Sequence, residues 1–195
     1  VLLLHGFPDL PTGWLRVAGR LNAAGYRTVI PYLRGYHPAT FSDRGFAASD
    51  QADDVALLLD ALGEHTAVVV GHDWGADAAY SSATLHPDRV TKMVACGIPH
   101  PSTLKPSLGS AWAGRHFVYF KLPWAQTTAR LFGLRMVGRL YRRWAPSWTG
   151  PTRDASVAAA VEAFRDPRVL RGGLAYYKAL VPANPVYRSK IGVPG

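Results

Sequence analysis

Gly71-His72-Asp73-Trp74-Gly75-Ala76 is the stretch of sequence that decides the fold. It directly follows the β-branched apolar run 66–70 and directly precedes a stretch with helical periodicity. A turn this sharp between a strand and a helix leaves no space for bulky neighbours, and it holds the central residue in a strained conformation with its side chain presented to a ligand. The pattern therefore predicts a nucleophile elbow in which Asp73 is the nucleophile. The helix N-terminus beside it favours the ionised carboxylate by roughly 0.3–1 kcal/mol.

An aspartate between glycines at the start of a helix can also serve only as an N-cap. A second motif argues against that alternative. His5-Gly6-Phe7-Pro8 follows the first predicted strand, and proteins with a nucleophile elbow take the second amide of the oxyanion hole from this place. Two motifs in the expected structural order favour a catalytic role for Asp73.

Short β-branched runs alternate with longer helical stripes over the first hundred residues, which is typical of a parallel sheet covered by helices. The predicted strands are 1–4, 27–30, 66–70 and 90–98. Two predicted helices each have an apolar face that is followed by a glycine, and a third covers 74–85 and ends before a proline. The residues of the two faces are Trp14, Val17, Ala18 and Leu21, and Val55, Leu58, Leu59 and Leu62.

From Pro99 onward the sequence shows helical stretches that are separated by prolines, and no further strand pattern. We therefore expect an α/β protein with the first part of its core in residues 1–100, a helical cap in 101–185 inserted after the fourth strand, and a return to the core in 186–195. The chain opens in mid-strand and ends where another strand is expected to begin. We interpret it as the incomplete core of a longer protein, since a four-stranded sheet with two open edges invites association.

Five segments together resemble the epoxide hydrolase and haloalkane dehalogenase branch of the α/β-hydrolase superfamily. They are His5-Gly6-Phe7-Pro8-Asp9, Arg34-Gly35-Tyr36, Gly71-His72-Asp73-Trp74-Gly75-Ala76, His86-Pro87-Asp88-Arg89-Val90 and Pro99-His100-Pro101. The resemblance implies an α/β-hydrolase fold in which Asp73 attacks an sp³ carbon and forms an alkyl ester. A water activated by a histidine then hydrolyses the ester, and the backbone N–H groups of Phe7 and Trp74 hold the oxyanion. The resemblance also implies that the catalytic acid and the histidine lie after Gly195.

The leaving group depends on the predicted cap, because an epoxide oxygen needs a proton donor and a halide does not. By resemblance, Tyr177 is the second of two tyrosines that epoxide hydrolases use as donors. The position of the first donor is taken by His116, and Tyr119, which lies one helical turn away, is the residue expected to substitute for it. We predict that His5, Pro8, His116, Tyr119 and Tyr176 line the substrate pocket, and that His5 also organises its loop. Ordinary packing of these aromatic side chains is the alternative.

The leading interpretation is a hydrolase of small organic electrophiles, of the epoxide hydrolase kind. Phe7 favours it over a haloalkane dehalogenase, because by resemblance those enzymes usually carry asparagine at this position as a halide ligand. Fluoroacetate-type dehalogenases share the phenylalanine, so a dehalogenase stays open as an alternative. From a different class, a ligand-binding pseudo-hydrolase or an inactive fragment is the other alternative.

The chain carries a formal net charge of +9, and residues 101–150 contain eight Lys or Arg and no Asp or Glu. Such a basic run with aromatic residues could form a nucleic-acid or membrane surface. We interpret it as a helical lobe with arginines in solvent and aromatics packed inward. The single cysteine, Cys96, permits no internal disulfide, which suits the cytoplasm. We expect a small-molecule substrate, no nucleic-acid or membrane partner, no cofactor and no metal; the oligomeric state is left open.

Overall fold

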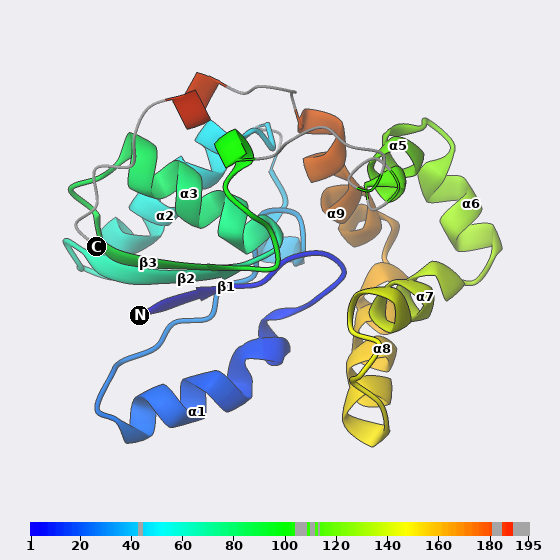
Figure 1. The fold of residues 1–195 in the computed structure, drawn as a ribbon, viewed down its shortest axis with the longest axis horizontal. Helices are drawn as coiled ribbons and strands as arrows, with labels where there is room; N and C mark the ends of the chain where they lie inside the picture. The colour runs from blue at the N-terminus through cyan, green and yellow to red at the C-terminus, as the bar shows by residue number, and fades with distance from the viewer. Residues whose placement is uncertain (43–44, 104–108, 110–111, 113, 181–184, 189–195) are drawn as a thin grey trace.

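The computed structural model describes all residues except 43–44, 104–108, 110–111, 113, 181–184 and 189–195 (Figure 1). A parallel sheet in the order β1-β2-β3 forms the centre of the N-terminal part. Its strands are β1 (Leu2–Leu4), β2 (Ala67–His72) and β3 (Val90–Cys96). In the register, Leu4 pairs with Gly71, and Gly71 pairs with Ala95. The carboxyl ends of the three strands therefore lie side by side, next to Asp73, which follows β2.

The predicted strand 27–30 is not formed. Val29 makes one isolated parallel bridge to Leu2, in which the Leu3 N–H donates to the Val29 carbonyl and the Val29 N–H donates to the Val1 carbonyl, both at 2.9 Å. The next residue that would donate to β1 is Pro31, which has no N–H, so the ladder stops after one bridge. The helical part of the chain therefore follows the third strand and not a fourth, which the sequence had predicted.

Helices cover both faces of the sheet (Figure 1). On one face lie α2 (Ala48–Ala61) and α3 (Trp74–Leu85), and on the other lies α1 (Leu15–Ala23), which follows the 3₁₀ turn η1 (Pro11–Trp14). The predicted bounds of α3 are confirmed. In α2, Val55 and Leu59 are buried as predicted. In α1 the predicted apolar face is wrong in part, because Ala18 is buried while Val17 is exposed.

The later part of the chain is helical, as the proline-separated stretches predicted. It forms α5 (Arg115–Lys121), α6 (Ala125–Leu131), α7 (Arg135–Trp144), α8 (Pro151–Phe164) and α9 (Pro167–Ala179). Pro151 and Pro167 stand in the first turn of α8 and α9, where a proline costs no hydrogen bond. The 3₁₀ turns η2 (Pro38–Thr40), η3 (Pro101–Thr103) and η4 (Pro185–Arg188) complete the described elements. The division into a core and a cap at residue 101 stays a prediction.

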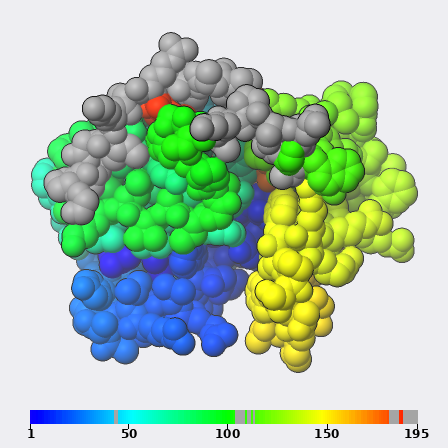
Figure 2. Space-filling view, in the orientation of Figure 1, coloured from blue at the N-terminus to red at the C-terminus, as the bar shows by residue number. Residues whose placement is uncertain are grey.

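The helices α5 to α9 lie beside the sheet. Their aromatic and aliphatic side chains form a cluster with Phe7 and Tyr36 of two loops and with Trp74 at the start of α3. Figure 2 shows α8 alongside the N-terminal segment. Phe120 is buried in this cluster, but Trp112 and Trp124 are mostly exposed, so the expectation that the aromatics of this segment pack inward is only partly right. Among the described residues, no helix combines the length and the apolar character that crossing a bilayer requires.

Candidate active site

Asp73 occupies the turn between β2 and α3 in a strained backbone conformation, with φ 54° and ψ −117°. Three glycines make this turn possible. A Cβ atom on Gly71 would lie 2.0 Å from the Gly75 carbonyl oxygen, and one on Gly75 would lie 2.1 Å from the Leu4 carbonyl oxygen. A Cβ atom on Gly6 would lie 2.4 Å from the Asp73 Cβ. The predicted elbow geometry is therefore present.

The carboxylate of Asp73 is half-buried and is held by backbone N–H groups. The Phe7 N–H donates to Oδ1 at 2.8 Å. Burial raises the pKa of Asp73 to about 6, while the backbone N–H groups of Phe7 and Trp74 and the nearby His72 act in the opposite direction. The carboxylate is therefore mostly ionised at pH 7. Both N–H groups that the sequence suggested for an oxyanion hole point to this carboxylate.

His5 and Pro8 shape the loop that brings Phe7 to Asp73. The His5 Nδ1 contacts the Gly6 carbonyl oxygen at 3.1 Å, and the Leu33 N–H donates to Nε2 at 3.1 Å. Burial lowers the pKa of His5 to about 4, so the ring is neutral. Both ring nitrogens are engaged by the backbone, which fits the predicted organising role and leaves none for a substrate. Pro8 is buried and follows a cis peptide bond.

Tyr177 lies on α9 with its ring against the aromatic neighbours of Asp73. Its ring centroid is 4.9 Å from that of Trp74 and 5.4 Å from that of Phe7. The Tyr177 hydroxyl is buried and has no hydrogen-bond partner among the described residues, and the same holds for the Trp74 indole N–H. Two buried donors without an acceptor are costly, at roughly 1–3 kcal/mol each, so the site is suited to a ligand that accepts hydrogen bonds.

The protonation state of Tyr177 follows from the same surroundings. Burial, and then the negative charge of Asp73, raise the pKa of the Tyr177 hydroxyl well above its ordinary value. The Trp74 indole lies near enough to oppose part of this shift without forming a hydrogen bond. The hydroxyl therefore stays protonated at all pH values at which the protein is expected to work.

The other predicted pocket residues differ in what they contact. His116 is half-buried, and its ring centroid lies 5.9 Å from that of Tyr177. Tyr119 does not join this group, since its hydroxyl lies 2.6 Å from the Thr128 Oγ1 of α6. Its predicted role as a second donor opposite Tyr177 is therefore not supported. The Tyr176 hydroxyl donates to the Arg34 carbonyl oxygen at 2.9 Å, so Tyr176 is an anchor of α9.

Close backbone packing also sets the position of α9. A Cβ atom on Gly172 would lie 2.3 Å from the Gly35 carbonyl oxygen, so the helix and the loop 34–36 meet without a side chain between them. The sequence does not indicate this contact, because a glycine inside a helical stretch gives no sign of its partner. Together with the hydrogen bond of Tyr176, this contact fixes the position of α9, and therefore of Tyr177, relative to Asp73.

The substitution Gly172→Ala is expected to destabilise the protein by roughly 1–3 kcal/mol, because the added methyl group must push α9 away from the loop. The better helix propensity of alanine, worth up to about 1 kcal/mol, opposes this effect. Urea unfolding measures the change. Gly138→Ala on α7 is the matched control, since a Cβ atom there meets its nearest side chains at 3.5 and 3.6 Å. Equal effects of the two substitutions would contradict the packing argument.

Two further residues near Asp73 were missed by the sequence analysis. Tyr36 is buried, and its hydroxyl has no hydrogen-bond partner among the described residues. Asp77 is a buried carboxyl on α3 that accepts hydrogen bonds from Gln51, at 3.0 Å, and from Tyr187. Burial raises the pKa of Asp77, and its charge contributes to the raised pKa of Asp73. Asp77 stands in an apolar helical stretch, and its charge is the only feature of the sequence there that indicates a special role.

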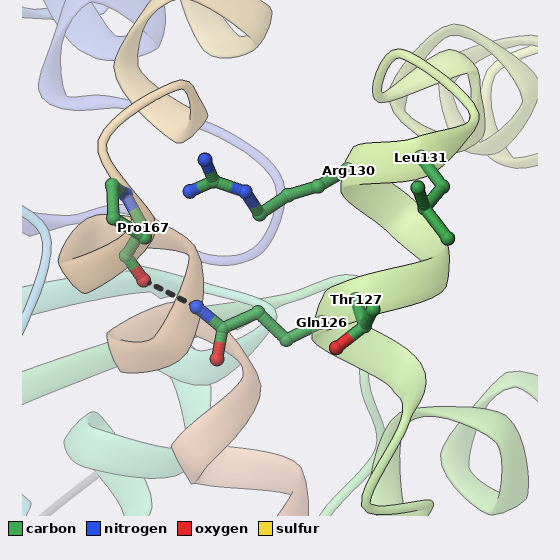
Figure 3. Close-up of a pocket in the computed structure, with 5 residues that line it drawn as sticks. All are labelled: Gln126, Thr127, Arg130, Leu131 and Pro167. Carbon is green, nitrogen blue, oxygen red and sulfur yellow. Dashed lines mark hydrogen bonds between the residues drawn. The ribbon is translucent and has the colours of Figure 1, made fainter.

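Two cavities in the described part of the chain lie away from Asp73. One is a surface hollow of about 670 Å³ between α6 and the start of α9 (Figure 3). The other, of about 530 Å³, lies between α2 and the loop around Arg34 and reaches Tyr176. Asp73 lines neither of them. The candidate active site is therefore defined by the groups that surround Asp73 and not by these cavities.

Comparison with known proteins identifies the class. The family model described as alpha/beta hydrolase fold matches residues 1–162, and the chain belongs to this family. The AB hydrolase superfamily protein YfhM of Bacillus subtilis is 34% identical over 132 residues, which are 63% of this chain and 45% of that protein. Epoxide hydrolase B of Mycobacterium tuberculosis is 40% identical over 101 residues, which are 51% of this chain and 28% of that protein.

A solved structure supports the same placement. A Pseudomonas aeruginosa protein that is provisionally named an epoxide hydrolase superposes with a TM-score of 0.78 at 26% identity, over 91% of this chain and 61% of that one. Within the α/β-hydrolases, the chain is thus similar to the epoxide hydrolase branch, as the sequence motifs predicted. The chain spans less than two thirds of the length of each of these three proteins.

Proposed function

We propose that the protein is a hydrolase of small organic electrophiles that opens epoxides through an alkyl ester on Asp73. One observation carries this proposal: the buried, protonated hydroxyl of Tyr177 has no hydrogen-bond partner among the described residues, and it lies near enough to the Asp73 carboxylate for that charge to raise its pKa. Opening an epoxide generates an alkoxide, which needs a proton at the moment it leaves. The Tyr177 hydroxyl can give its proton to that oxygen while the Asp73 carboxylate attacks the carbon, which supports this chemistry.

In the first step, a carboxylate oxygen of Asp73 attacks an epoxide carbon and the carbon–oxygen bond breaks. Tyr177 donates its proton to the departing oxygen, which becomes a hydroxyl, and water later reprotonates the tyrosinate. The other carboxylate oxygen becomes the carbonyl oxygen of the ester. If this is Oδ1, it already accepts the Phe7 N–H in the resting protein. The donor is thus in place before the reaction begins, so no reorganisation is needed.

In the second step, water attacks the ester carbonyl carbon and a base takes its proton. The N–H groups of Phe7 and Trp74 stabilise the oxyanion, and its collapse releases the diol and restores Asp73. Among the described residues, no histidine is both paired with a carboxylate and placed at Asp73; His86 pairs with Asp53 on the surface. We therefore assign the base to none of these residues.

Halide displacement is the second candidate, and the Trp74 indole favours it. Its N–H is buried beside Tyr177 without an acceptor among the described residues, and an N–H donor of this kind can hold a departing halide. Displacing a halide needs no proton transfer. The two candidates therefore differ in their dependence on Tyr177, which mutation can measure.

Intact-protein mass spectrometry after incubation with styrene oxide tests the proposal. We expect one covalent adduct that maps to Asp73 and is absent from Asp73→Ala. With residues 1–195 alone we expect the adduct to persist, because the ester would lack its base. Binding of the epoxide without an adduct would instead identify a ligand-binding protein. Steady turnover by residues 1–195 would show that this part of the chain supplies the base.

The pH dependence of adduct formation follows from the raised pKa of Asp73, at about 6. Only the carboxylate is nucleophilic, so the rate should be half-maximal near pH 6 and should fall about tenfold per unit well below that value. It should stay level from pH 7 to 9, because the pKa of Tyr177 is raised and the hydroxyl keeps its proton. Single-turnover rates from pH 5 to 9 measure this profile. A level rate down to pH 5 would contradict it.

A further inference from the structure

A hydrophobic surface lies on α6 and on the turn that follows it. Trp124, Leu131 and Phe132 are 55%, 76% and 66% exposed. Trp124 and Leu131 stand at the two ends of α6, about two turns apart, so they share one face of the helix. Phe132 extends this face into the turn. Large apolar side chains gathered in one exposed place mark an interaction site more often than scattered ones do.

Basic residues stand close to these three side chains in the sequence. Lys121, Arg130 and Arg135 flank them, and the stretch 101–150 contains no acidic residue. Figure 3 shows Gln126 and Arg130 reaching from α6 toward Pro167 at the 670 Å³ hollow, which Leu131 also lines. Gln126 donates to the Pro167 carbonyl oxygen at 2.7 Å, while Arg130 forms no ion pair with any residue that the structure describes. A cation at an open hollow beside an apolar face can receive an anionic group.

The sequence led us to expect no membrane partner, but from this exposed surface we propose the opposite. The surface, made of Lys121, Trp124, Arg130, Leu131, Phe132 and Arg135, binds a membrane that contains anionic phospholipid. Trp, Leu and Phe side chains enter the boundary between headgroups and acyl chains, and Lys and Arg side chains bind lipid phosphates. Arg130 takes a headgroup phosphate at the hollow. Figures 1 and 2 place α6 at the outer margin of the molecule, away from the sheet, where a flat surface can approach it.

Two other occupants fit the observations less well. A second copy of the chain would bring two basic surfaces together, and the three apolar side chains expose on the order of 400 Å² where a stable interface takes about 800 Å² from each partner. A nucleic acid would stack its bases on aromatic rings, but the most exposed of the three side chains is Leu131, which has no ring.

Vesicle flotation tests the proposal. The protein is mixed with vesicles of phosphatidylcholine alone, or with 30% phosphatidylglycerol, and the bound fraction is measured. We expect binding to the anionic vesicles that weakens with salt, and at least tenfold weaker binding to the neutral ones. Changing Trp124, Leu131 and Phe132 together to Ser should weaken binding at least tenfold, and each of Arg130→Gln and Arg135→Gln should weaken it roughly fivefold.

The matched control changes Leu15 and Leu57, which are 59% and 52% exposed on α1 and α2, to Ser. Its binding should equal that of the unchanged protein, and all variants should keep their circular dichroism because every altered side chain is exposed. Equal loss in the control, or equal binding to both kinds of vesicle, would overturn the proposal. Two other results would also overturn it: a dimer that forms with rising protein concentration, or binding to an oligonucleotide but not to vesicles. In either case the Ser variant of the proposed surface would have to abolish the interaction.

Discussion

Asp73→Asn is expected to lower epoxide consumption by at least roughly 10⁴-fold and, at pH 8, to raise the melting temperature by a few degrees. Activity is lost because an amide oxygen is a poor nucleophile and cannot form the ester. Stability rises because the folded protein no longer has to bury a charge. In the wild-type protein the folded-state pKa of Asp73 is raised to about 6, so the folded state binds this proton more tightly than the unfolded state does.

The sign of this effect fixes the pH window. Wild-type stability should fall as the pH rises from the ordinary pKa of an aspartate, near 4, to about 6, and should then stay level. The asparagine variant lacks this loss, so the two proteins should differ at pH 8 and converge near pH 4. Calorimetry at both pH values measures the difference. A variant that is less stable at pH 8 would mean that the hydrogen bonds to the carboxylate outweigh the cost of its burial.

The sequence predicted the elbow because the physics there is local. A strand that turns at once into a helix needs small residues at fixed spacing, and Gly71 and Gly75 show the requirement without any knowledge of their surroundings. The bounds of α3 were predictable for the same reason. The absence of a strand at 27–30 was not predictable from the pattern of β-branched residues. The pattern indicated a strand, but Pro31 has no N–H and ends the ladder after one bridge.

Contacts between distant segments were beyond prediction from the sequence. Nothing in the order of residues indicated that Tyr176 would donate to Arg34 or that Gly172 would meet Gly35. Resemblance gave Tyr177 the role of a donor and Tyr176 a place in the pocket. It did not indicate that the Tyr176 hydroxyl is engaged or that the Tyr177 hydroxyl has no hydrogen-bond partner among the described residues. Whether a buried hydroxyl keeps its capacity to donate is visible only in three dimensions.

That difference between neighbours makes the test of Tyr177 a sharp one. Tyr177→Phe is expected to slow epoxide opening by roughly 10² to 10⁴, the usual contribution of a general acid, and to leave displacement of bromide from an alkyl bromide within a few-fold of its original rate. The ring that packs on Trp74 is retained, so only the proton donor is removed. Single-turnover adduct formation with both substrates measures the two rates on one scale.

Tyr176→Phe is the matched control, because it removes a buried hydroxyl from the next residue of the same helix. That hydroxyl holds α9 to the Arg34 carbonyl oxygen, so its loss should change both reactions by a similar and smaller factor through a shift of the helix. A large loss that falls on the epoxide alone, in Tyr177→Phe alone, therefore identifies a proton donor. Equal losses on both substrates in Tyr177→Phe would show that Tyr177 only packs against its neighbours, and halide displacement would then become the better assignment for this site.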